Sequence, residues 1–169
     1  NVTSAATTIN GDIHRSFSGS TARDDSLYIS QISPLEEIRV ASKDIRYIYT
    51  NILKEGKVLL VLNPSPLNDN DGDGRPDLAP ALMDEYQNPA PELLSALTEQ
   101  KTVVSEVYED EWGVFISSYA PFFDAKGEFV GTLGMDLELN NFYKRLSPVD
   151  IAFEKTVVII LFIGLMTGL

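Results

Sequence analysis

Acidic side chains recur at alternate positions in an irregular segment near the middle of the chain, and Gly74 follows the third of them. This is the order of the first part of an EF-hand-type calcium loop, in which alternating carboxylate oxygens converge on a hard cation and a glycine makes the turn. Carboxylates packed this closely repel one another unless a cation joins them. The sequence therefore predicts a calcium ion, with the expected ligands Asp69, Asp71, Asp73, the backbone carbonyl of Arg75, and Asp77.

The end of this loop departs from the pattern, because Pro80 stands where a bidentate glutamate belongs. Asp84 or Glu85, which follow farther along the chain, or water would then complete the coordination. The alternative interpretation is a solvated acidic turn that holds no ion.

A second group of candidate residues lies on two predicted strands, 112–123 and 129–137. Side chains alternate between the two faces of a strand, which places Asp136 with Val130, Thr132 and Gly134. The opposite face carries apolar residues, so it predicts the core (Leu133, Met135 and Leu137). Asp136 then faces a polar, pocket-like side, unless it caps the following helix or bonds to backbone.

On the longer strand the same alternation places Phe115, Ser117 and Tyr119 on one face. The other face then carries Trp112, Val114, Ile116, Ser118 and Ala120. Aromatic rings with polar tips suit small-ligand pockets, although they serve equally well in ordinary sheet packing. The candidate ligand-binding residues are Asp136, Tyr119, Ser117, Tyr47, Tyr49 and Trp112. The single histidine, His14, has no cysteine partner for a zinc site and is predicted to lie on an exposed helix surface.

Helices are predicted first along the chain. Residues 1–23 carry Ile9, Ile13 and Phe17 at helical spacing, a second helix begins at Asp24 or Asp25, and a third begins with Ser33 as N-cap and Pro34 at the first helical position. The stripe of the first helix either pairs across a two-fold axis in a homodimer or packs on the chain's own sheet.

Strands follow, because β-branched and aromatic residues alternate between turn signals. They are predicted over 45–50, 58–62, 102–107, 112–123 and 129–137, with a long irregular insertion over 63–91 and helices near 92–99 and 140–146. About five strands joined by tight turns, with helices packed on them, predict an α+β fold with an antiparallel sheet.

The segment from Ser117 to Asp136 resembles the C-terminal hairpin of extracytoplasmic PAS-like sensors, the Cache or PDC family. The family form is S-x-Y-A-P, an apolar pair, D-x-x-G, and then V-G-x-x-G followed by an apolar residue and aspartate. Residues 45–50 resemble the family's first strand, and the region around Asp12 and His14 resembles its long N-terminal helix.

The resemblance implies a central antiparallel sheet with a long helix on one face and a ligand pocket on the other. In amino-acid-binding relatives, an aspartate at the position of Asp136 receives the ammonium group of the ligand. The Arg-Trp-Tyr motif that such relatives use for the carboxylate is not evident, and the insertion over 63–91 departs from the commonest versions of the family.

The run from Thr156 to Leu169 contains no charged residue. Because a membrane-spanning helix needs about 20 apolar residues, we expect 151–169 to be the start of a truncated transmembrane helix and 1–150 to be the extracytoplasmic sensor domain. The alternative is a buried C-terminal helix. The domain would then lie in the periplasm or outside the cell, with the protein held in the inner membrane by flanking spans.

Composition narrows the function further. The formal net charge of −12 disfavours nucleic acid as a partner, and the absence of cysteine excludes thiol catalysis. No hydrolase elbow, P-loop or metalloprotease motif is present, so we do not expect catalysis in this fragment. The expected function is ligand or ion sensing for a receptor of the histidine kinase, diguanylate cyclase or chemoreceptor type, whose kinase or cyclase domain would lie elsewhere. The alternative is a calcium-stabilised structural or adhesive module anchored to a membrane.

Overall fold

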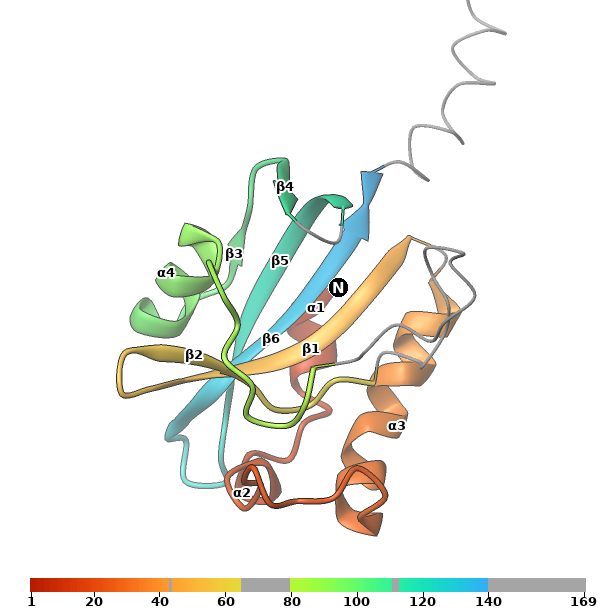
Figure 1. Cartoon of the computed structure of the whole chain (residues 1–169), viewed down its shortest axis with the longest axis vertical. Helices are drawn as coiled ribbons and strands as arrows, with labels where there is room; N and C mark the ends of the chain where they lie inside the picture. Colours follow the sequence, from red (N-terminus) through yellow and green to blue (C-terminus); the bar gives the residue numbers. More distant parts are fainter. Residues whose placement is uncertain (43, 65–79, 111–112, 140–169) are drawn as a thin grey trace, which may run out of the picture.

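The structure is a computed structural model that describes residues 1–42, 44–64, 80–110 and 113–139. Its centre is a six-stranded antiparallel sheet with the strand order β2-β1-β6-β5-β3, and β4 also pairs with β5 (Figure 1). The strands are β1 (Ile45–Lys54), β2 (Lys57–Leu60), β3 (Val103–Val104), β4 (Tyr108–Asp110), β5 (Gly113–Phe123) and β6 (Phe129–Glu138). The predicted α+β class with an antiparallel sheet is confirmed.

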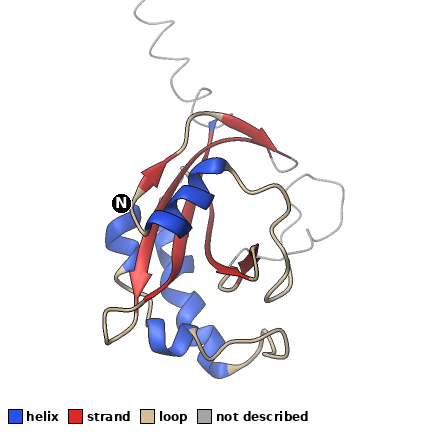
Figure 2. Ribbon diagram, turned by 90° about the vertical axis from the view of Figure 1, so that its left-hand side faces the viewer, coloured by secondary structure: helices blue, strands red, loops and turns tan. Residues whose placement is uncertain are grey.

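Helices cover both faces of this sheet, as Figures 1 and 2 show. They are α1 (Val2–Ala6), α2 (Gly11–His14), α3 (Ser26–Ala41) and α4 (Pro91–Glu99). The first and third helices pack with the larger apolar core, which contains Leu35, Ile48 and Leu133. The fourth helix packs with a second cluster on the opposite face, around Leu93 and Tyr119. The two sides of the sheet therefore have separate packing partners.

The predicted single helix over 1–23 is wrong, because the segment forms two short helices. Asn10 has an extended backbone, and its side chain accepts a hydrogen bond from the Ile13 amide and so caps a new helix. The Cβ of a side chain at Gly11 would lie 2.5 Å from the Phe123 carbonyl oxygen, so glycine permits this close approach. Ile9 and Phe17 are buried in the larger core, which is the second of the two interpretations offered for the stripe.

The long helix of the domain is α3, which begins after Asp25, one of the two predicted starts. The predicted separate helix beginning at Ser33 is wrong, because Pro34 lies inside the continuous helix. The Ser33 hydroxyl donates to the Ile29 carbonyl instead of capping a new helix. Leu35 is fully buried and Ile38 packs against the larger core.

Four of the five predicted strands occur near their predicted bounds, whereas the one predicted over 102–107 is limited to Val103–Val104 and is followed by the separate strand Tyr108–Asp110. Both tight turns use left-handed backbone. Glu55 and Gly56 form the two-residue turn between β1 and β2, and Gly127 takes a positive φ in the turn before β6. The predicted grouping of Val130 with Asp136 is wrong. The register between β5 and β6 shifts beside Phe123, and the extra residue turns Val130 into the larger core.

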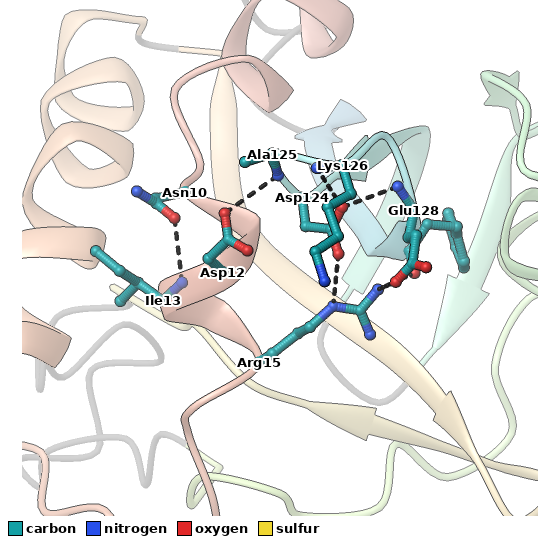
Figure 3. A network of polar contacts seen from close by, with 9 residues as sticks. Asn10, Asp12, Ile13, Arg15, Asp124, Ala125, Lys126 and Glu128 are labelled. Atoms are coloured by element: carbon teal, nitrogen blue, oxygen red, sulfur yellow. Dashed lines mark hydrogen bonds and ion pairs between the residues drawn. The ribbon is translucent and has the colours of Figure 1, made fainter.

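The turn between β5 and β6 is bonded to α2 (Figure 3). Asp12 accepts a hydrogen bond from the Ala125 amide at 3.1 Å, and Arg15 Nε lies 3.3 Å from Asp124. Asp124 also accepts from the backbone amides of Lys126 and Glu128, and the latter bond is the main cause that lowers its pKa. The D-x-x-G part of the family-like motif is thus a turn that holds the N-terminal segment on the sheet.

His14 is buried, with 2% of its surface exposed, so the predicted exposed position is wrong. Its Nε2 lies 2.8 Å from the Thr50 hydroxyl, and its ring meets Phe122 edge to face. Burial, with a smaller contribution from Arg15, lowers the pKa of His14 to about 3. The neutral imidazole therefore joins α2 to β1 within the core.

Several predicted features lie outside the described residues: the calcium loop over 69–77, Trp112, the helix over 140–146 and the apolar run from Thr156. Among the residues that the structure does describe, no helix is long and apolar enough to span a membrane.

His14 makes folding sensitive to acid. Its pKa is about 3 in the folded protein and 6.5 in an unfolded chain, so stability is complete above pH 6.5 and falls as the pH drops towards 3. Between pH 7 and 4.5, we expect the wild type to lose about 2.5 kcal/mol more free energy of unfolding than His14→Gln. Urea unfolding at both pH values measures this difference. Equal losses in the two proteins would contradict the assignment of a neutral buried imidazole.

Candidate functional site

Polar and aromatic side chains form three consecutive rows on the face of the sheet that α4 partly covers. Each row takes one residue from β1, one from the central strand β6 and one from β5, and the register pairs them directly. The rows are Tyr47–Asp136–Ser117, Tyr49–Gly134–Tyr119 and Asn51–Thr132–Pro121. Five of the six predicted ligand residues lie in the first two rows, so the structure brings them together as predicted.

Asp136 lies at the centre of the first row with 4% of its surface exposed. The same carboxylate oxygen accepts hydrogen bonds from the Tyr49 hydroxyl, at 3.1 Å, and from the Ser117 hydroxyl. Tyr108 lies 2.7 Å from Ser117, and because the serine proton is directed to Asp136, Tyr108 acts as the donor in that contact. The carboxylate thus binds strands on both sides of β6.

Gly134 allows this arrangement. A Cβ at that position would lie 2.7 Å from Cε2 of Tyr49, which is closer than packed atoms approach, so the tyrosine ring occupies the space above the glycine. From there the ring directs its hydroxyl to Asp136. The glycine in the family-like motif is therefore a positioning residue for the candidate site.

The tyrosine hydroxyls around Asp136 remain protonated at neutral pH. Burial first, and then the negative charge of Asp136, raises the pKa of Tyr49, Tyr108 and Tyr119 above its ordinary value. Neutral hydroxyls donate hydrogen bonds, whereas phenolates would repel the carboxylate. The site is a carboxylate surrounded by aromatic donors, a set of groups that suits a positively charged ligand.

Two aromatic residues of this face were not predicted. Tyr108 stands on β4 and packs on Phe115, with ring centroids 6.1 Å apart, and Tyr86 packs edge to face on Tyr49 at 6.2 Å. Tyr86 belongs to the irregular insertion, where the sequence has no strand periodicity that would assign a side chain to one face of the sheet. Tyr108 directly follows the predicted strand over 102–107, so the pattern that predicts this strand does not include it.

No group of three or more acidic or histidine side chains that would hold a metal ion occurs among the described residues. The predicted calcium ligands are outside that set, so the calcium site stays a prediction.

No protein-family model matches the sequence, and no curated protein matches it. The periplasmic sensory domain of the Campylobacter jejuni chemoreceptor Tlp1 is 16% identical with a TM-score of 0.51, over 86% of this chain and 54% of the Tlp1 chain. This likeness shows the fold, which is similar to that of the matched part of the Tlp1 domain, as the family resemblance implied.

Two further solved structures are similar at lower scores. The ligand-binding domain of C. jejuni Tlp3, solved with 4-methylisoleucine, is 18% identical over 82% of this chain and 50% of its own, with a TM-score of 0.48. The ligand-binding domain of the Pseudomonas aeruginosa PAO1 amino-acid chemoreceptor PctC, solved with GABA, is 17% identical over 83% of this chain and 50% of its own, with a TM-score of 0.46. The chain spans about half the length of these solved chains.

Replacement of Gly134 tests the positioning of Tyr49. Gly134→Ala should lower the free energy of unfolding by about 1–3 kcal/mol, because the added methyl group displaces the tyrosine ring. Gly19→Ala is the matched control, since the nearest atom to its Cβ would lie at 3.9 Å, and we expect a change within about 0.5 kcal/mol. Urea denaturation measures both values. A Gly134→Ala protein as stable as the control would contradict the proposed close contact.

Proposed function

We propose that this chain is the extracytoplasmic ligand-sensing domain of a transmembrane signalling receptor, and that it binds a small, positively charged molecule at Asp136. Asp136 carries this proposal: it is a buried carboxylate on the central strand, surrounded by tyrosine rings and hydroxyl donors. An ammonium group placed beside a buried carboxylate forms a strong charge-assisted hydrogen bond.

The fold supports the same function. The fold is similar to that of the Tlp1 periplasmic sensory domain over 54% of the Tlp1 chain. The polar rows lie on the face that the family resemblance assigns to the ligand pocket. A sheet face on which each of three adjacent rows contains at least two polar or aromatic residues also favours a binding domain over a calcium-stabilised structural or adhesive module. The proposed location is the periplasmic side of the inner membrane.

The link to signalling is a second part of the proposal. Strand β6 carries Asp136 and ends at Glu138, so a change at the ligand site has a short covalent path to the residues that follow the sheet. A ligand shifts the balance between two receptor arrangements only through its different affinities for them. We place the output domain, of kinase, cyclase or chemoreceptor type, outside this chain.

A homodimer stays a prediction. Its surface would not include Ile9 and Phe17, because both side chains are buried in the larger core.

The neutral variant Asp136→Asn tests the ligand site. We expect primary amines and amino acids to raise the melting temperature of the wild type by binding its folded state. Titration calorimetry on the best of them should show an affinity at least about 30-fold weaker for Asp136→Asn, because the charge partner of the ammonium is lost. Glu128→Gln, on a side chain that is 69% exposed, is the matched control and should bind like the wild type. Equal affinity of Asp136→Asn and the wild type would reject the role of Asp136.

Calcium is a separate proposal, based on the order of acidic residues over 69–77. Binding to the folded state should raise the melting temperature as calcium is added to millimolar concentration. The rise should vanish in the double variant Asp71→Ala, Asp73→Ala and persist in Asp24→Ala, a control outside the loop. A melting curve that does not change with calcium would refute the site.

A further inference from the structure

The third row of the sheet face contains two polar residues that are not hydrogen-bonded to Asp136. Asn51 of β1 and Thr132 of β6 are direct register partners. Alternation along the strands points both side chains to the face that carries Tyr49 and Asp136. The row therefore continues the strip of polar residues away from the carboxylate.

Both residues are completely buried, with 0% of their surface exposed. Within the described part of the chain, the amide oxygen and nitrogen of Asn51 and the hydroxyl of Thr132 have no hydrogen-bond partner. Each buried polar atom without a partner costs stability, and a pair of apolar residues of the same shape would avoid that cost. Asn51 and Thr132 are thus placed where stability alone favours leucine and valine.

A second buried threonine shows the contrast. Thr50 precedes Asn51 and points to the opposite face, where its hydroxyl accepts from the Leu62 amide and contacts His14. The Thr50 hydroxyl therefore has hydrogen-bond partners within the fold, whereas the Thr132 hydroxyl has none among the described residues. The polar groups of the third row are therefore available for hydrogen bonds to partners outside the described part of the chain.

The chemistry of the pair defines what it would bind. Asn51 offers two donors and one acceptor, and Thr132 adds a hydroxyl, but neither carries a charge. The complement is a neutral group with both a donor and an acceptor, such as a carboxamide. Thr132 and Asp136 are four residues apart on one strand, which corresponds to about 13 Å between their Cα atoms. The second row, with Tyr49 and Tyr119, lies between them.

We propose that Asn51 and Thr132 form a second polar anchor of the ligand site, which binds the neutral end of an elongated molecule whose cationic end lies at Asp136. This inference rests on the proposed function. It narrows the ligand to an amine that carries a distant carboxamide-like group, with an apolar middle part beside the tyrosine rings. Recognition by a hydrogen-bonding pair of this kind discriminates strongly against ligands that lack the group.

The test compares two matched series of probes on the complete chain: ω-amino amides with four, six and eight carbons, and the plain alkylamines of the same lengths. For the wild type, we expect the best amide to bind at least about tenfold tighter than its alkylamine. Thr132→Val and Asn51→Leu should remove this preference. Without ligand, their melting temperatures should stay unchanged or rise, because an unsatisfied polar group is lost.

Thr50→Val is the control, and it should lower the melting temperature while it keeps the amide preference. The inference is overturned if Thr132→Val retains the preference, if its melting temperature falls like that of Thr50→Val, or if the wild type binds alkylamines as tightly as amides. In this last case, loss of alkylamine binding in Asp136→Asn would leave the proposed function intact. A wild type that binds neither series would overturn both.

Discussion

The hydrogen bonds that Asp136 accepts from Tyr49 and Ser117 are the interactions on which the polar face of the sheet depends. They place a buried carboxylate on the middle strand and tie it to the strands on both sides. Because a buried charge is costly without donors, the surrounding hydroxyls have to stay protonated, and burial with the charge of Asp136 ensures this. Gly134 is required by the same interaction, since a larger residue would displace Tyr49.

The opposite face of the sheet gives this arrangement a rigid support. There the larger apolar core is closed by α1 and α3, His14 is bonded to Thr50, and Arg15 holds the turn around Asp124. Polar groups on that face are partnered, whereas Asn51 and Thr132 on the other face are not within the described residues. One face of the sheet therefore serves stability, and the other retains groups suited to binding.

The sequence predicts the sheet well, because alternation and turn residues are local signals. A period of two groups Ser117 with Tyr119 on one strand and Asp136 with Gly134 on the next, and the register of the two strands then places these groups side by side. Errors arose where a local cap, a β-bulge or a distant contact overrides the periodic pattern. The cap at Asn10 and the close approach at Gly11 break the first helix, and the extra residue at Val130 changes its face. The sequence predicts that His14 lies on the polar surface, and only the tertiary fold shows that it is buried.

A crystal structure of the chain with a bound amine would test directly whether Asp136 is the ligand-binding residue. We expect an ammonium nitrogen within about 3 Å of a carboxylate oxygen of Asp136, on the α4 side of the sheet. An amine bound at any other place, with Asp136 contacted solely by protein groups, would refute ligand binding at Asp136.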